Sequence, residues 1–194
     1  MPLPLDLRIA VAPLETYRAL TSEPVEGSWL RALERPALVA VIVGAAVTLS
    51  SAERVPVGLV AMGILCWSFV PALQLAVGAI VSGMAPARSI TMARAIELLF
   101  MAQLPWSLWV IGITGLRSFT PFSLSLPVEV TSLLIPGVWT PIILSAFCQA
   151  ALGCSKSRAR RLTTVHQTII WVLFFGYVFL ASGFWARIVA AVGR

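Results

Sequence analysis

The sequence predicts an all-α fold: a polytopic membrane helical bundle of five transmembrane helices with an N-terminal interfacial amphipathic segment. The first observation is composition, because 59% of the 194 residues are hydrophobic and only 11% are charged. Soluble domains are about 45–50% apolar and about 25% charged, and disordered chains are poor in aliphatic residues. The second observation is that the apolar residues form long runs. The third is that Lys and Arg gather in alternate gaps between these runs, as in the cytoplasmic loops of membrane proteins.

Five apolar runs approach the ~20 residues that a helix needs to cross a hydrocarbon core of ~30 Å. They cover residues 36–52, 57–85, 95–116, 128–153 and 165–192. A membrane β-barrel is excluded, because its strands are short and alternate between apolar and polar residues. The chain is therefore expected to have a cytoplasmic or interfacial segment at 1–35 and a five-helix transmembrane domain at 36–194.

Prolines interrupt the predicted spans at Pro71, Pro105, Pro136 and Pro141. The tripeptide Ile135-Pro136-Gly137 is expected to unwind the fourth span locally. Two interpretations remain open: the broken helices line a ligand cavity, or they are kinks that neighbouring helices tolerate. The sequence favours kinks.

The N-terminal segment is not apolar enough to span a membrane. Residues 14–20 and 28–33 are expected to form short amphipathic helices that lie in the headgroup plane, and Trp29 is an aromatic residue of the kind found at that depth. A poorly ordered tail is the alternative. Prolines and charges interrupt the first residues, which differ from a secretory signal, so the start is expected to be retained and cytoplasmic.

The positive-inside rule orients the predicted spans. Of the 14 Lys and Arg residues, ten fall on the N-terminal side and four on the other. The ten are Arg8, Arg18, Arg31, Arg35, Arg88, Arg94, Lys156, Arg158, Arg160 and Arg161, and the four are Arg54, Arg117, Arg187 and Arg194. The N-terminus is therefore expected in the cytoplasm and the C-terminus outside, in a cell inner (plasma) membrane.

Four polar side chains in or near the spans are candidate functional residues, because intramembrane polar groups are expensive. Gln74 lies one turn after Pro71, where it either joins two helices or lines a substrate path. Gln103 has the same two interpretations. Glu97 follows Arg94 by three residues, which favours a surface ion pair. His166 is the only histidine, and an interfacial polar position is favoured over a pigment or single-ligand metal site.

The sequence contains no recognisable set of catalytic residues. GxSxG, HExxH and P-loop patterns are absent, and Glu97 and Glu129 are expected at opposite faces of the membrane. The three cysteines form no CxxC motif, and one histidine supplies neither a haem with two axial histidines nor a catalytic zinc site. We therefore predict no enzyme activity, no metal site and no cofactor.

Two features predict contacts with lipids or partners. Headgroup or partner contact is expected from Trp29, Arg31, Arg35, Lys156, Arg158, Arg160 and Arg161. Close helix packing, within the bundle or with other membrane subunits, is expected from rows of small residues. These rows are Ala40/Gly44/Thr48, Ala72/Ala76, Ala79/Gly83 and Ser182/Ala186/Ala190. The basic residues follow the loops, so nucleic acid is not an expected partner.

The layout resembles the Yip1-domain family over roughly residues 12–190. The resemblance is carried by Ala12-Pro13 with Tyr17, by Leu104-Pro105, by Gly137-Val138-Trp139-Thr140-Pro141, and by Leu152-Gly153-Cys154-Ser155-Lys156 with Arg158-Ala159. It implies a bacterial-type, non-catalytic five-span membrane protein that shapes membranes or recruits partners. Asp6-Leu7 is followed by Arg8-Ile9-Ala10 instead of completing the eukaryotic Asp-Leu-x-Gly-Pro signature, so small-GTPase binding is not implied.

The sequence leaves three functional hypotheses. The first is a non-enzymatic scaffold or accessory subunit of a membrane complex that acts through its basic face and its helix packing. The second is a transport component for a lipid or small hydrophobic solute, with Gln74 and the broken fourth span lining the path. The third is an accessory subunit of an electron-transfer or light-harvesting complex that holds a pigment through His166.

Overall fold

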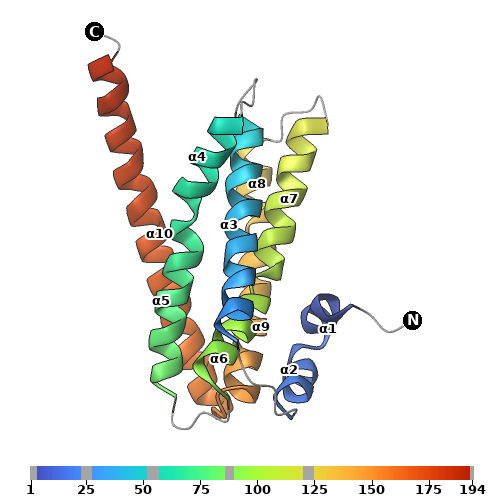
Figure 1. The fold of residues 1–194 in the computed structure, drawn as a ribbon. Helices are drawn as coiled ribbons and strands as arrows, with labels where there is room; N and C mark the ends of the chain where they lie inside the picture. Colours follow the sequence, from blue (N-terminus) through green and yellow to red (C-terminus); the bar gives the residue numbers. More distant parts are fainter. Residues whose placement is uncertain (1–3, 23–27, 52–56, 86–89, 120–124, 193–194) are drawn as a thin grey trace.

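The computed structural model describes residues 4–22, 28–51, 57–85, 90–119 and 125–192. Every regular element in these ranges is helical (Figure 1). The helices are α1 (Leu5–Val11), α2 (Pro13–Ser22), α3 (Trp29–Ser51), α4 (Val57–Trp67), α5 (Phe69–Gly83), α6 (Met92–Met101), α7 (Leu104–Phe119), α8 (Leu126–Ser132), α9 (Leu134–Ala150) and α10 (Lys156–Val192).

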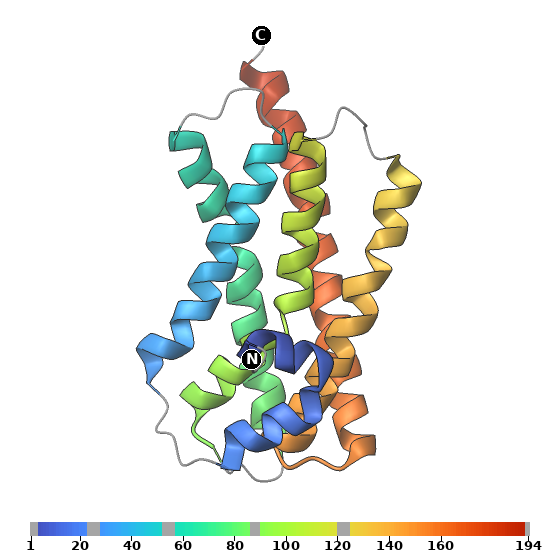
Figure 2. The same ribbon diagram turned by 90° about the vertical axis from the view of Figure 1, so that its right-hand side faces the viewer.

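The helices form a bundle in which α4 continues into α5, α6 into α7, and α8 into α9 (Figures 1 and 2). Within the described residues, four segments are long and apolar enough to cross a membrane: Trp29–Leu49, Val57–Gly83, Met92–Ile113 and Val130–Ala150. They correspond to the first four predicted spans. The all-α fold is therefore confirmed for the described residues, and four of the predicted spans are long and apolar enough for a membrane protein.

Three of these segments are broken at a position that a following proline determines. The helices α4, α6 and α8 end at Trp67, Met101 and Ser132. Each end lies four residues before a proline, and these prolines are Pro71, Pro105 and Pro136. Proline has no N–H to bond the carbonyl four residues earlier, and its ring clashes with that carbonyl. The helix therefore stops there and restarts within two or three residues.

The expected unwinding at Ile135-Pro136-Gly137 was wrong in its position. These three residues belong to the first turn of α9, and the break is at Leu133. A proline in a first helical turn lacks only an N–H that would be unpaired in any case, so the disruption falls on the preceding turn. Pro141 stays inside α9 without ending it.

The turn between α9 and α10 has the residues that such a turn requires. Gly153 has a φ of 62°, a left-handed conformation that favours glycine after a helix end. The Ser155 hydroxyl then accepts a hydrogen bond from the Arg158 backbone N–H at 3.4 Å, as an N-cap does. This turn brings the start of α10 back against α9.

The helices α3 and α4 pack through small residues. A Cβ added at Gly44 would overlap the Ile64 backbone, and one added at Gly63 would overlap the Thr48 hydroxyl. The row Ala40/Gly44/Thr48 is thus a buried contact surface. By contrast, Ala72 and Ala76 are exposed, so this row makes no such contact within the chain. The side chains of Ser182, Ala186 and Ala190 lie outside the described residues.

The helices α1 and α2 form a hairpin that packs against the bundle (Figure 2). Three side chains hold it through main-chain carbonyls. Tyr17 donates its hydroxyl to the Leu98 carbonyl at 3.0 Å, Trp139 donates its indole N–H to Ala10 at 3.0 Å, and Arg94 donates to Leu20 at 3.4 Å. These carbonyls lie in the last turns of α6, α1 and α2, where helical partners are missing.

The N-terminal segment differs in one way from the expectation. The amphipathic helix expected at 14–20 lies within α2, and its Tyr17 is buried against Phe147 in the bundle. The second short helix, expected at 28–33, is the first part of α3, which continues through Pro36. Residues 28–33 are apolar enough to extend the span that follows, so no separate interfacial helix forms there.

Tyr17→Phe is expected to destabilise the protein by about 1–2 kcal/mol, because the Leu98 carbonyl loses its donor in a buried site. Burial raises the pKa of the Tyr17 hydroxyl, so it remains a donor at physiological pH. Unfolding in mixed micelles by SDS titration measures the loss. Tyr177→Phe, which removes a hydroxyl from an exposed side chain, is the control. An equal effect of both substitutions would contradict the assignment.

Basic side chains gather at the end of the bundle where α10 begins. They come from α1, α2 and the starts of α3, α6 and α10, and the C-terminal end of α10 lies at the opposite end (Figure 1). These residues are Arg8, Arg18, Arg31, Arg35, Arg94, Lys156, Arg158, Arg160 and Arg161. Arg54, Arg88 and Arg194 lie outside the described residues, as do the side chains of Arg117 and Arg187.

Candidate functional site

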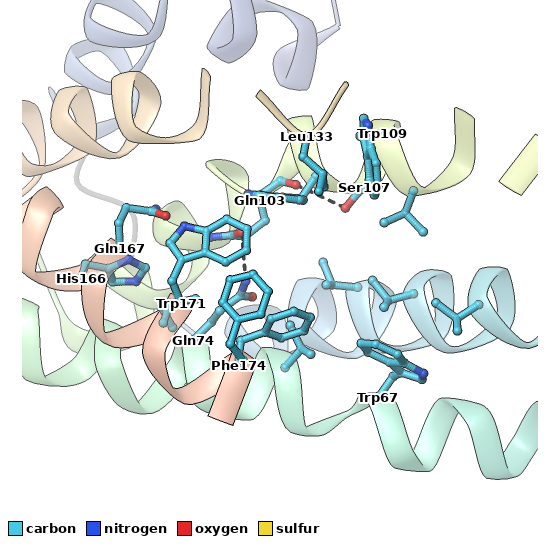
Figure 3. Close-up of a pocket in the computed structure, with 18 residues that line it drawn as sticks. Trp67, Gln74, Gln103, Ser107, Trp109, Leu133, His166, Gln167, Trp171 and Phe174 are labelled. Atoms are coloured by element: carbon cyan, nitrogen blue, oxygen red, sulfur yellow. Dashed lines mark hydrogen bonds between the residues drawn. The ribbon is translucent and has the colours of Figure 1, made fainter. Parts of the chain in front are cut away.

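A cavity of about 320 Å³ lies inside the bundle, between α3, α5, α7 and α10 (Figure 3). Ligand pockets begin at about this size, since they range over roughly 300–1,000 Å³. Eighteen residues line the cavity: Val39, Val43, Val47, Trp67, Val70, Gln74, Gln103, Trp106, Ser107, Trp109, Val110, Leu133, His166, Gln167, Ile170, Trp171, Phe174 and Phe175. None of the eighteen carries a permanent charge.

The three helix breaks converge on this cavity. Trp67 is the last residue of α4, Gln103 lies between α6 and α7, and Leu133 lies between α8 and α9, and all three are lining residues. Prolines placed one turn later in three different spans thus shape one site. This arrangement corresponds to broken helices that line a cavity, the interpretation that the sequence analysis did not favour.

One end of the cavity is polar. Figure 3 shows Gln74, Gln103, His166 and Gln167 gathered there, with Trp67 and Trp109 towards the other end. Gln74 donates its Nε2 to the Oε1 of Gln103 at 3.0 Å, and this hydrogen bond is buried. The pair joins α5 to the break after α6, so it ties two spans together beside the cavity. The Oε1 of Gln74 is itself buried and has no partner in the described structure.

His166 is a buried residue of this polar end, with only 1% of its surface exposed. The side chain is therefore inside the bundle, and its interfacial depth in a membrane stays a prediction. Neither Nδ1 nor Nε2 has a hydrogen-bond partner among the described residues. His166 lies three residues after Thr163 and four before Ile170 on the face of α10 that packs on the bundle, and this helical spacing carries it inward.

Aromatic side chains form the walls around the polar end. Trp171 is their centre: its ring lies 5.2 Å from Trp106, 6.2 Å from Phe174 and 5.3 Å from Phe175 between centroids. Trp109 packs on Trp106 and donates its indole N–H to the Ser132 hydroxyl at 2.9 Å. Phe175 is exposed, so the aromatic wall reaches the outside of the bundle beside α10.

The other predicted site residues do not line the cavity. Glu97 pairs with Arg94 at 2.8 Å, and Arg35 pairs with Asp6 at 2.8 Å. Trp29 and Arg31 are exposed at the start of α3. The remaining predicted contacts are exposed at the start of α10: Lys156, Arg158, Arg160 and Arg161. Arg158 also donates to the Met84 carbonyl at 2.6 Å, which joins α10 to the end of α5.

The sequence pattern alone does not mark the aromatic residues of the cavity wall as a site. Trp106 and Trp109 are three residues apart, and Trp171 is three and four residues before Phe174 and Phe175. These are spacings that place side chains on one helical face. Aromatic residues are also common on lipid-facing surfaces, so this spacing alone does not indicate a cavity. The cavity becomes evident only in the tertiary structure, where the aromatic residues of α7 and α10 face each other.

The hydrogen bond between Gln74 and Gln103 is expected to contribute a coupling free energy of about 0.6–1.7 kcal/mol, the range found for polar pairs between transmembrane helices. A double-mutant cycle of Gln74→Leu and Gln103→Leu measures it through SDS titration. A cycle of Gln74→Leu with Gln149→Leu is the control, because Gln149 bonds within α9 to Ser145. Equal coupling in both cycles would contradict a direct interaction.

Comparisons with protein-family models, with curated proteins and with solved structures find no match to this chain. Within the residues that the structure describes, no three His, Cys, Asp or Glu side chains come together as a metal site would require. The function is therefore argued from the cavity.

Proposed function

We propose that this protein binds a neutral hydrophobic molecule in the cavity and acts as a transport component for a lipid or small hydrophobic solute. The observation that carries this proposal is an aromatic-walled cavity at the level of three helix breaks. Tolerated kinks pack against neighbouring side chains, whereas these breaks border empty space. Broken helices at membrane depth are found where they line a cavity.

The lining selects for neutral molecules. Its residues are apolar, aromatic or uncharged polar side chains, and burying an unpaired charge beside them would be very unfavourable. Only a few polar groups border a largely apolar space, as in small-molecule sites, where polar groups fix the orientation of the ligand. A lipid or a hydrophobic solute fits this chemistry, and an ion does not.

The proposed topology has five spans, with the N-terminus in the cytoplasm and the C-terminus outside the plasma membrane. It is supported by the 37 residues of α10, which at ~1.5 Å per residue exceed the ~30 Å of a hydrocarbon core. The gathering of basic residues where α10 begins also supports it. In this topology α10 is the fifth span, and its inner face closes the cavity.

The test is native mass spectrometry of protein purified from membranes in mild detergent. Wild-type protein is expected to retain a neutral lipid adduct. Val43→Trp fills the cavity and is expected to abolish that adduct, whereas Val41→Trp, on the same helix but exposed, is expected to keep it. The proposal fails when the two variants retain the same adducts as wild type.

A second candidate function is that of a Yip1-like scaffold or accessory subunit, without enzyme activity. It is supported by the basic cluster of Lys156, Arg158, Arg160 and Arg161, whose side chains are exposed. The two ion pairs found among the described residues involve Arg35 and Arg94, so none of these four cations is neutralised by a described carboxylate, although Arg158 also donates to the Met84 carbonyl. Anionic headgroups or an acidic partner could pair with them. Co-purification in mild detergent tests this candidate, and a lone monomer would count against it.

A further inference from the structure

We propose that the molecule held in the cavity carries a hydroxyl group, which sits at the polar end against His166 and Gln74. This inference rests on the proposed function, because it names the chemical class of the molecule that the cavity binds. It is carried by three buried polar atoms at this end that have no hydrogen-bond partner among the described residues: both ring nitrogens of His166 and the Oε1 of Gln74.

The unpaired atoms of His166 require a group that both donates and accepts. The ring is almost fully buried, and no carboxylate lines the cavity, so a neutral imidazole is favoured over an unpaired buried charge. A neutral imidazole has one N–H donor and one acceptor nitrogen. The Oε1 of Gln74 adds a second acceptor. Leaving such atoms unpaired in a buried site is unfavourable.

A hydroxyl is a small neutral group that pairs two of these three atoms, one more than a group that only accepts. It accepts one hydrogen bond from the His166 N–H and donates one to an acceptor at the same end. A quinone, ketone or ester carbonyl only accepts, so it would leave the Gln74 oxygen and the second imidazole nitrogen unpaired. An amine would arrive as a cation in a cavity whose lining has no anionic side chain. An alcohol or phenol has an O–H donor that its oxidised or esterified form lacks, so the site is expected to bind the alcohol or phenol more tightly.

The remainder of the molecule is expected to be unsaturated. Beyond the polar end it meets the rings of Trp171, Phe174 and Trp106, which already pack edge to face on one another. Aromatic rings pack favourably with other π systems in edge-to-face and offset geometries. An alkylated phenol and a prenol both offer a hydroxyl followed by sp² carbon.

The test compares alcohols with analogues that lack only the hydroxyl. Binding of tritiated farnesol to the detergent-solubilised protein is competed with 4-decylphenol, with 4-decyltoluene, with unlabelled farnesol, and with the hydrocarbon in which a methyl replaces the farnesol hydroxyl. Wild-type protein is expected to bind at least one alcohol about tenfold more tightly than its methyl analogue, which corresponds to ~1.4 kcal/mol. The arm with the larger preference distinguishes a phenol from a prenol.

Variants of the polar end assign the preference to its residues. His166→Leu is expected to reduce the preference to less than about threefold while the methyl analogues bind as before. His166→Gln retains a donor and an acceptor and is expected to restore part of it. Gln74→Leu is also expected to reduce the preference for the alcohol over its methyl analogue. Thr164→Leu, at an exposed position of α10 outside the cavity, is the control and is expected to keep that preference.

The outcomes separate this inference from the proposed function. Equal affinity for alcohols and methyl analogues, with binding that Val43→Trp abolishes, overturns the hydroxyl and leaves the hydrophobic cavity in place. A preference that persists in both His166→Leu and Gln74→Leu also overturns it. Absence of saturable binding for all four compounds, together with absence of a retained adduct, overturns the proposed function as well.

Discussion

Gly44→Leu is expected to give the largest loss of stability of any single substitution in the bundle. A Cβ at this position would overlap the Ile64 backbone, and backbone atoms move only when the whole of α4 moves. Overpacking typically destabilises by about 1–3 kcal/mol, and a full leucine side chain at a backbone contact is expected to reach at least ~3 kcal/mol. SDS titration of purified protein in mixed micelles measures the change.

The matched control for Gly44 is Gly112, a helical glycine of α7 whose added Cβ meets nothing within 4 Å. Gly112→Ala is expected to be neutral or to stabilise by up to ~1 kcal/mol, because alanine favours the helix more than glycine does. Gly63→Ala is expected to be destabilising through its overlap with the Thr48 hydroxyl, and Thr48→Ala in the same chain should relieve much of that loss. A Gly44 variant as stable as the Gly112 variant would contradict the close contact of α3 and α4.

Leu144→Ala is expected to have the second largest effect, a destabilisation of about 2 kcal/mol. Leu144 is fully buried in the core that α9 shares with the N-terminal hairpin and α10. Substitutions of this kind destabilise soluble cores by about 2–5 kcal/mol through lost transfer free energy and the cavity that remains. In a membrane the transfer contribution is small, because lipid tails are as apolar as leucine. The expected destabilisation therefore comes mainly from lost van der Waals contacts and lies at the low end of the range for soluble cores.

Leu134→Ala is the control on the same helix, since Leu134 is 64% exposed. Lipid or detergent fills the space that its truncation leaves, so its unfolding free energy is expected to change by less than ~0.5 kcal/mol. Similar losses from both truncations would indicate that Leu134 is covered by a partner. That result would favour the accessory-subunit candidate over an isolated transport component.

The proposed cavity has a consequence for the prolines that shape it. Pro71, Pro105 and Pro136 each end a helix four residues earlier, and the break residues Trp67, Gln103 and Leu133 line the same space. A single kink would leave one isolated defect. Three breaks facing one another leave a volume that no side chain fills, and this is the volume that we propose binds a neutral molecule.

The N-terminal hairpin shows how packing changes the role of a residue that a sequence pattern locates correctly. Tyr17 lies on the apolar face of the amphipathic helix expected at 14–20, and both lipid and the bundle were possible neighbours. The structure places it against Phe147 and bonds its hydroxyl to Leu98, 81 residues away in the chain. No local pattern places that carbonyl beside Tyr17, because the two residues meet only through the packing of α2 on the bundle.

The sequence by itself determined that most of the chain is apolar enough to lie in lipid rather than in water. It also determined the order of the helices. Apolar runs of about 20 residues have one stable form in lipid, in which each backbone group bonds within its own helix, and prolines must disturb these helices wherever they occur. Only the tertiary structure decided where the polar side chains point. Gln74 and Gln103 meet, and the His166 side chain lies inside the bundle. The physical reason is that helix formation depends on neighbours a few residues apart, whereas a cavity is space left between helices by residues distant in sequence.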